Sequence, residues 1–342
     1  MPANTHTPIT QPGSAAPDAN EYEDLLGLWA DLETSLSWLL LRPRLTEDFP
    51  AKLRQCDRWL QDLVAHDTDA ALYLMFQLAA TSTVGYSASH ALVCGTLCHI
   101  LAHELKLPSI ERDSLVRAAF TMNIGMTALQ DELAHQRERP TAAQQRVIDA
   151  HPRLGMELLE ELGIRDEVWL EVVGQHHAAA ADSDTRASPL RLLGAEGRLC
   201  RILATIDRYA AMISPRKSRI GRSSTDSVRA IVSQEVVDQS DEVGFALVRR
   251  VGLCPPGTFV RLDNGDTAVV LRHGDRPMYP LVASLLDRQG GQLARPALHH
   301  TGTGKPRIQS ALARSAVPLE LNHRTMVRLG LYAALPGHGL GT

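Results

Sequence analysis

The sequence predicts a mainly helical protein that carries a small β-hairpin module near its C-terminal end. Through most of the chain, apolar residues recur at spacings of three and four, as on one face of a helix. At Cys254-Pro255-Pro256-Gly257 the pattern changes to strand-like alternation around Asn264-Gly265. Apolar residues make up 44% of the 342 residues but aromatic residues only 4%, so Leu, Val, Ile and Ala must form most of the core.

The N-terminal part is expected to be a short disordered stretch followed by helices. Residues 1–20 are rich in Pro, Ala, Thr and Asn and lack the apolar content of a core. Residues 21–80 form an N-terminal helical region, in which Arg42-Pro43 ends the first helix and further helices cover about 51–64 and 69–80. This region is a candidate for self-association or for binding a protein partner.

Residues 81–252 are expected to form the central helical domain. Thr141-Ala142-Ala143-Gln144 is a capping box that starts one helix after Pro140, and Gly163 ends it. The other helices are expected near 86–106, 109–121, 165–178, 189–213 and 225–249.

Residues 253–300 are expected to form the β module. Strands are predicted at about 258–262, 267–271 and 281–286, with a type I′ turn at Asn264-Gly265 between the first two. Residues 301–342 are punctuated by Gly and Pro and are assigned as a C-terminal tail.

Bulk properties exclude several classes of protein. The net charge is −4, which argues against a general nucleic-acid binder, because such proteins usually present a basic face. The five cysteines include no CxxC pair, which favours a reducing compartment over a disulfide framework. No apolar run reaches the ~18 residues that span a bilayer, and the N-terminus does not have the pattern of a secretory signal. We therefore expect a cytoplasmic protein without a membrane segment.

Five residues on different predicted helices are candidate metal ligands: His90, His151, His176, His177 and Asp207. His151 begins the stretch His-Pro-Arg-Leu-Gly, and the adjacent pair His176-His177 ends an apolar helix. Imidazole and carboxylate together suit iron, manganese or zinc.

His90 also begins a stripe with Cys94 and Cys98 at helical spacing. Such a stripe could bind zinc, but buried cysteines on a core helix are the favoured interpretation.

The order and spacing of these five residues resemble those of the HD-GYP family, a branch of the HD phosphohydrolase superfamily. The resemblance covers about residues 81–252 and continues into the hairpin that starts at Pro255. It implies an HD-domain helical bundle in which these residues bind two or three metal ions and the substrate is cyclic di-GMP.

The chain departs from the family at the defining HD pair. Met122 stands where the family has the His, Asn123 where it has the Asp, and Met126 where it has a Lys. The GYP motif is also absent. A thioether is a poor ligand for iron, manganese or zinc in an N/O site, and a carboxamide lacks the charge of a bridging carboxylate. The resemblance therefore implies that phosphodiesterase activity is lost or weak.

Two outcomes remain open for the metal. His151, His176 and His177 suffice for a single ion with an open position, which leaves His90 and Asp207 as an incomplete second site. Alternatively, the histidines are hydrogen-bonded and bind no metal. Arg216, in a basic run after Asp207, is a candidate phosphate contact; the alternative is a solvated loop.

Three functions follow. The first is a cyclic-dinucleotide sensor or interaction module in bacterial cyclic di-GMP signalling, with little or no catalysis. The second is an active metal-dependent phosphohydrolase that uses the three-histidine site on this or another phosphate ligand. The third is a scaffold without a ligand.

Overall fold

The computed structural model describes most of the chain between residues 19 and 334. The described residues are 19–81, 85–177, 188–214, 222–235, 242–274, 276, 279–317, 319 and 322–334. The helices are α1 (Ala19–Leu41), α2 (Phe49–His66), α3 (Thr68–Thr81), α4 (Tyr86–Glu104), α5 (Ser109–Thr121), α6 (Thr127–His135), α7 (Ala142–Glu161), α8 (Glu167–Gln175), α11 (Ala195–Ile213), α12 (Ser224–Glu235), α13 (Glu242–Val251) and α14 (His323–Ala334). Short 3₁₀ turns lie at Pro43–Leu45, Ile124–Met126, Leu190–Leu192 and Arg314–Ala316. The strands are β1 (Phe259–Leu262), β2 (Thr267–Arg272), β3 (Leu281–Leu286), β4 (Gln292–His300) and β5 (Ile308–Leu312).

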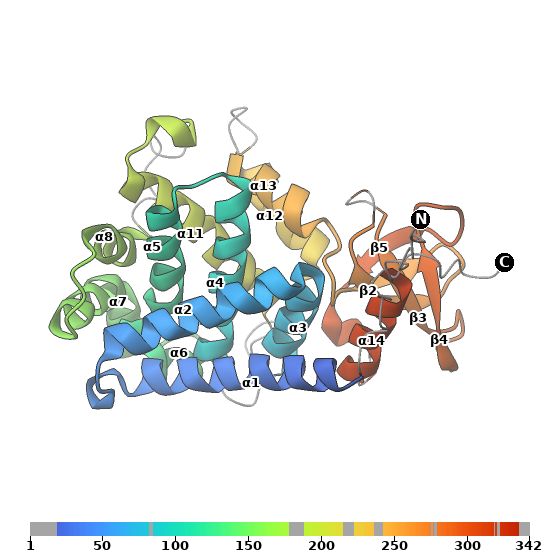
Figure 1. The fold of residues 1–342 in the computed structure, drawn as a ribbon, viewed down its shortest axis with the longest axis horizontal. Coiled ribbons are helices and arrows are strands. Elements are labelled where there is room, and N and C mark those ends of the chain that lie inside the picture. Colours follow the sequence, from blue (N-terminus) through green and yellow to red (C-terminus); the bar gives the residue numbers. More distant parts are fainter. Residues whose placement is uncertain are drawn as a thin grey trace, which may run out of the picture.

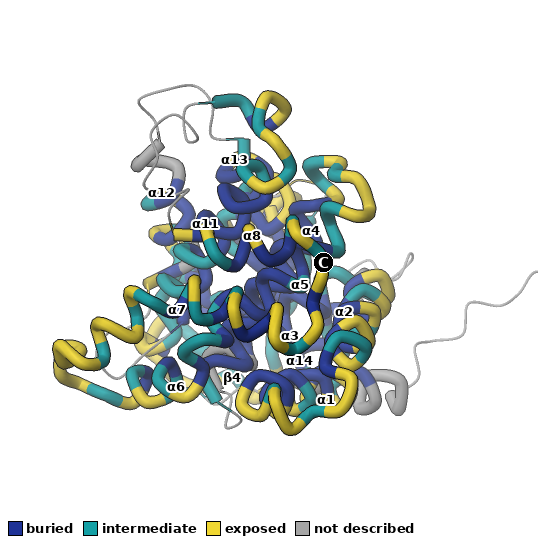
Figure 2. Tube along the Cα trace, turned by 90° about the vertical axis from the view of Figure 1, so that its left-hand side faces the viewer, coloured by how far each residue is buried: buried dark blue, intermediate teal, exposed yellow. Residues whose placement is uncertain are grey.

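The helical body is built around α4. Every residue from Ser87 to Ala102 is buried, as expected of a helix that is apolar on all sides. Helices α1, α3, α5, α6, α11 and α13 all pack against it (Figure 1). In Figure 2 the buried residues gather around α4, α5 and α11, and the exposed ones lie at the periphery. The predicted fold class, a mainly α bundle with a small β module, is confirmed.

Most helix positions agree with the sequence patterns. The capping box at the start of α7 is complete. The Thr141 hydroxyl accepts from the backbone N–H of Gln144, and the Gln144 side-chain oxygen accepts from the backbone N–H of Thr141. The structure gives two helices, α12 and α13, for the single one expected over 225–249, and residues 236–241 lie outside the described part. Helix α6 was not expected, because its nine residues give too short an apolar pattern. Residues 1–18 of the expected disordered N-terminus also lie outside the described part.

The β module is an antiparallel sheet with strand order β4-β3-β2-β1-β5. The Asn264-Gly265 hairpin is present, but the predicted type I′ turn is wrong, since Gly265 has a φ of 92° and Asn264 is not among the residues with positive φ. A type I turn followed by a left-handed glycine accounts for this geometry. The sequence pattern assigns residues 301–342 as a tail, but this segment contains β5 and α14. Strand β5 pairs with β1, and α14 packs on α1, α3 and β2.

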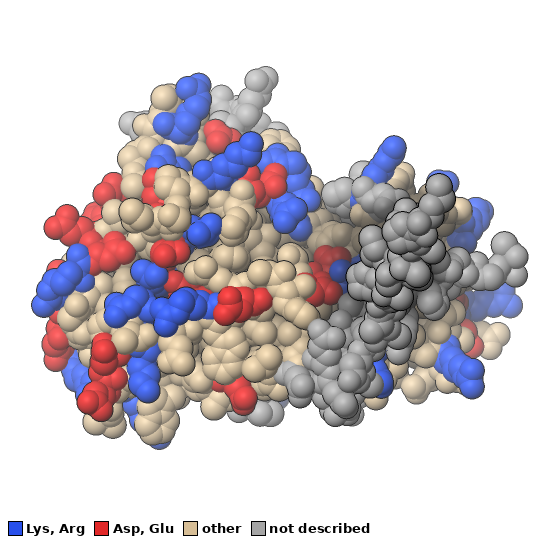
Figure 3. All heavy atoms as spheres, in the orientation of Figure 1, with Lys and Arg blue, Asp and Glu red and all other residues tan. Residues whose placement is uncertain are grey.

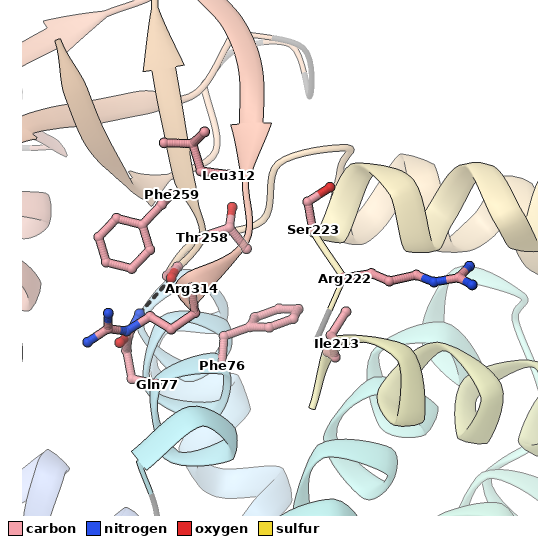
Figure 4. Close-up of a pocket in the computed structure, with 10 residues that line it drawn as sticks. Phe76, Gln77, Ile213, Arg222, Ser223, Thr258, Phe259, Leu312 and Arg314 are labelled. Carbon is pink, nitrogen blue, oxygen red and sulfur yellow. Dashed lines mark hydrogen bonds between the residues drawn. The ribbon is translucent and has the colours of Figure 1, made fainter. Parts of the chain in front are cut away.

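Polar contacts attach the β module to the start and end of α3. Arg272 at the end of β2 pairs with Asp67 at 2.6 Å, and the neighbouring His273 pairs with Asp69. At the other end, the Gln77 side chain donates to the Gly257 carbonyl at 2.6 Å. The junction leaves a cavity of about 50 Å³ beside Gln77 (Figure 4), which is large enough for water but not for a nucleotide.

The surface over the helical body is mixed in charge. Figure 3 shows basic and acidic side chains interspersed over this half of the molecule in that view. Within the described residues, we find no helix with the length and apolarity required to cross a membrane.

One buried group of α4 makes stability depend on pH. His99 is 6% exposed and its Nδ1 has no hydrogen-bond partner. Burial, aided by His103 and Arg112, lowers its pKa to about 4. Above pH 6.5 the imidazole is neutral in both the folded and the unfolded chain. Between pH 6.5 and 4 only the unfolded chain takes up the proton, so the folded state loses stability as the pH falls.

We therefore expect His99→Gln to flatten the acid side of the stability profile of the metal-free protein. The slope of unfolding free energy against pH between 4.5 and 6 should fall by roughly 1 kcal/mol per pH unit. Urea unfolding at several pH values measures this slope. His135→Gln, at an exposed position of α6, is the control and should leave the slope unchanged. An unaltered slope in His99→Gln would contradict the expectation.

Candidate metal centre

The proline that follows His151 fixes the orientation of its imidazole. Pro152 lies inside α7 and has no N–H to donate to the carbonyl of Ile148, four residues earlier. The Nδ1 of His151 bonds to that carbonyl instead, at 2.5 Å. Because a carbonyl can only accept, Nδ1 must carry the proton, and Nε2 of the neutral ring is left with a free lone pair.

His176 is oriented in the same way by a helix end. It caps the C-terminus of α8, where the last carbonyls have no partner within the helix. Its Nδ1 bonds to the carbonyl of Val173 at 2.8 Å, so its Nε2 also presents a lone pair. Trp169 anchors α8 to α5, because its indole N–H donates to the hydroxyl of Thr121 at 2.9 Å.

The two free lone pairs face each other. Nε2 of His151 and Nε2 of His176 are 3.3 Å apart, and the ring of His177 lies 4.1 Å from that of His176 between centroids. The ligand atoms of these three residues all lie within 4.8 Å of one another. Two imidazole nitrogens on a tetrahedral zinc ion would be about 3.3 Å apart, given Zn–N distances of about 2.05 Å.

The two buried imidazoles stay neutral at physiological pH. Burial, with the charge of His177, lowers the pKa of His176 to about 4. Burial also lowers the pKa of His151. A neutral imidazole is the form that ligates metal, so the donor set fits a divalent cation.

His90, Cys94 and Asp207 form a second group. Nε2 of His90 is 2.8 Å from Oδ1 of Asp207 on α11 and 3.6 Å from Sγ of Cys94, one turn later on α4. The ligand atoms of the three residues lie within 4.8 Å of one another. The ring of Tyr86 stacks on that of His90, with centroids 5.6 Å apart.

Asp207 links the two groups electrostatically. Burial opposes ionisation of its carboxyl group, but the hydrogen bond with His90 and the charge of that ring outweigh burial and lower the pKa of Asp207. His176 and His177 add to this lowering. The Asp207 charge in turn acts on His151 and His176 against the effect of their burial.

The residues that the resemblance aligns with the HD pair lie at the end of α5 and in the 3₁₀ turn that follows it. Met122 ends α5 and is buried in the apolar core, whereas Asn123 is partly exposed and Met126 closes the following 3₁₀ turn. The backbone of this turn touches α7: a Cβ on Gly125 would lie 2.6 Å from the carbonyl oxygen of His151. The 3₁₀ turn that follows Asn123 is therefore packed against the helix that carries His151.

The structure thus brings His151, His176 and His177 together and places His90 with Asp207. Arg216, the candidate phosphate contact, lies outside the described residues. The sequence pattern places Cys94 in a stripe with His90 and Cys98, for which a core role is favoured over zinc binding, and does not join it to Asp207. The helical spacing from His90 was the available signal.

Comparison with known proteins places part of the chain in a family. Residues 73–241 match the family model described as HD domain. The cyclic di-GMP phosphodiesterase PA4108 of Pseudomonas aeruginosa is 28% identical over 203 residues, which are 58% of this chain and 47% of that protein. This chain therefore spans about half the length of that relative. Among solved structures, Bd1817, a HDG"Y"P protein from Bdellovibrio bacteriovorus, aligns with a TM-score of 0.48 and 12% identity over 69% of this chain and 73% of its own.

Proposed function

Because this chain belongs to the HD superfamily, as the resemblance to its HD-GYP branch predicts, we propose that it binds cyclic di-GMP with little or no hydrolysis. In this proposal it acts as a sensor or interaction module in cyclic di-GMP signalling. A single divalent ion (iron, manganese or zinc) at the three-histidine group helps to hold the nucleotide. The match to a cyclic di-GMP phosphodiesterase supports this choice of ligand.

The observation that carries the proposal is the arrangement of His151 and His176. In each ring, Nδ1–H donates to a backbone carbonyl. The lone pairs of the two Nε2 atoms face each other, with these atoms 3.3 Å apart. Two facing lone pairs without a proton or cation between them repel. A shared cation removes this repulsion, which is why we favour a bound ion over a metal-free remnant.

The same group would attract a phosphate ligand once an ion is bound. Imidazole ligands carry no charge when they bind a metal, so three of them leave the charge of a divalent ion uncompensated, and His177 is exposed at the surface. When bound there, such an ion would polarise a phosphodiester oxygen and lower the pKa of a coordinated water.

Hydrolysis is expected to be weak because the shared bridging ligand is missing. A two-metal mechanism holds the attacking and leaving oxygens between two adjacent ions. Asn123 is neutral and cannot supply the bridging carboxylate, and Met126 offers no cation to a phosphate oxygen. The second candidate function, an active phosphohydrolase, is favoured by one feature: three protein ligands leave a coordination position open for water.

Signal output would use the N-terminal helical region. Several large apolar side chains of this region are exposed, among them Trp38 (52%) and Leu45 (78%). These residues support a role of the region in self-association or in contact with a protein partner.

Calorimetry with cyclic di-GMP on the manganese-loaded full-length protein tests the proposal. We expect saturable binding and, in a parallel assay, hydrolysis near background. His176→Ala should weaken binding at least 10- to 100-fold, since the loss of even an outer-shell metal partner has an effect of this size. His135→Gln is the matched control. Rapid hydrolysis of cyclic di-GMP by the unmodified protein would instead establish the active phosphohydrolase. If the protein bound neither metal nor nucleotide, the scaffold without a ligand would be the remaining function.

A further inference from the structure

Cys94 is set apart from the other cysteines of the core by its neighbours. It lies one helical turn after His90 on α4, and its sulfur faces both that ring and the carboxylate of Asp207. The side chains of Cys94 and His90 are buried, whereas that of Asp207 is 20% exposed. Cys98, a further turn along α4, is equally buried but is not part of either group of potential ligands in the described residues.

We propose that His90, Cys94 and Asp207 form a second metal site with a thiolate ligand, which binds zinc in preference to manganese. This inference extends the metal binding proposed above to a separate site, and it does not depend on recognition of cyclic di-GMP. A thiolate is a soft ligand that selects zinc over harder cations, whereas carboxylate and imidazole alone discriminate less.

The distances within the group fit tetrahedral zinc. With Zn–S of about 2.3 Å and Zn–N of about 2.05 Å, sulfur and nitrogen ligands should be about 3.6 Å apart. The separation between Sγ of Cys94 and Nε2 of His90 is 3.6 Å. Nε2 of His90 and Oδ1 of Asp207 are closer, at 2.8 Å, because they share a hydrogen bond. The ion would replace that bond with a small outward shift of the carboxylate, and a fourth position would stay open.

Charge balance also favours a divalent ion in this place. On binding, the thiol of Cys94 releases one proton to solvent. Nε2 of His90 also gives up the proton that it shares with Asp207, to solvent or to its own unpartnered Nδ1, because a ring nitrogen binds metal only through its lone pair. The resulting thiolate and the carboxylate of Asp207 together neutralise a divalent ion, so the loaded group has no net charge. A neutral group suits a buried position. The three-histidine group does not neutralise its ion and would remain attractive to anions, so the two sites would differ in both charge and metal preference.

Cobalt provides a spectroscopic test, because it occupies zinc sites and its bond to a thiolate absorbs in the near ultraviolet. The full-length protein loaded with cobalt should show this charge-transfer band. Cys94→Ser should abolish the band, whereas the matched variant Cys98→Ser and the three-histidine variant His176→Ala should retain it. A band that persists in Cys94→Ser, or unmodified protein that binds cobalt without the band or binds none, would overturn the proposal.

X-ray absorption at the zinc edge decides the question without a variant, in case Cys94→Ser does not fold. Zinc-loaded unmodified protein should show a sulfur neighbour at about 2.3 Å, and a first shell of only nitrogen and oxygen would contradict the site. In competition with a hundredfold excess of manganese, we expect His176→Ala, in which the three-histidine group is incomplete, to retain one zinc per chain. Loss of cyclic di-GMP binding in the earlier experiment would affect neither result, so the two proposals can fail independently.

Discussion

Restoring the HD pair with the double substitution Met122→His and Asn123→Asp is expected to raise the rate of cyclic di-GMP hydrolysis by on the order of 100-fold. The new carboxylate would follow directly on α5, and the adjoining 3₁₀ turn already contacts His151 through Gly125. Loss of one preorganised charge-stabilising group from an active site commonly costs about 10²- to 10³-fold in rate, and restoration should recover a similar factor. The measurement is product formation from cyclic di-GMP with manganese or iron present.

Two comparisons make this experiment specific. Asn123→Asp alone should give a smaller gain, because Met122 would still be a poor ligand. The double substitution combined with His176→Ala should give no gain in the rate of hydrolysis, because the three-histidine group would then lack one of its ligands. If the double variant folds and binds metal but remains inactive, the pocket has been remodelled beyond the HD pair and the proposed origin of the weak activity is wrong.

Gly125→Ala is expected to destabilise the protein and to disturb the three-histidine group together. The added Cβ would lie 2.6 Å from the carbonyl oxygen of His151 and 2.8 Å from the amide nitrogen of Gly155. Both contacts are to backbone atoms of α7, so no side-chain rotation relieves them, and the turn must move away from the helix. Overpacking of this kind costs about 1–3 kcal/mol. The midpoint temperature of thermal unfolding should fall by several degrees, and the protein should retain metal less well because His151 shifts.

Gly197→Ala, on α11, is the control for the loss of a glycine. Its Cβ would meet only the Leu193 side chain, at 3.8 Å, which is an ordinary contact. In a helix this change should leave the unfolding free energy unchanged or raise it by less than about 1 kcal/mol. Equal stability of Gly125→Ala and the unmodified protein would show that α7 and the turn are not tightly packed, and would remove the geometric link between the degenerate HD pair and His151.

The sequence by itself determined the elements whose signals are local. Apolar periodicity located most helices, the capping box fixed the start of α7, and strand β3 covers the residues predicted for it. The order of the histidine motifs along the chain indicates the family from the sequence alone. The helix, capping and strand signals work because each depends on a few consecutive residues and their own backbone.

Only the tertiary structure decided which side chains meet. Helix α4 is buried from Ser87 to Ala102 on every side, so it has no polar face from which its rotation can be predicted. The spacing places Cys94 one turn after His90, but only packing against α11 brings the carboxylate of Asp207 to this pair and not to Cys98. The same holds for β5 and α14, which are stabilised by contacts with strands and helices far away in the chain.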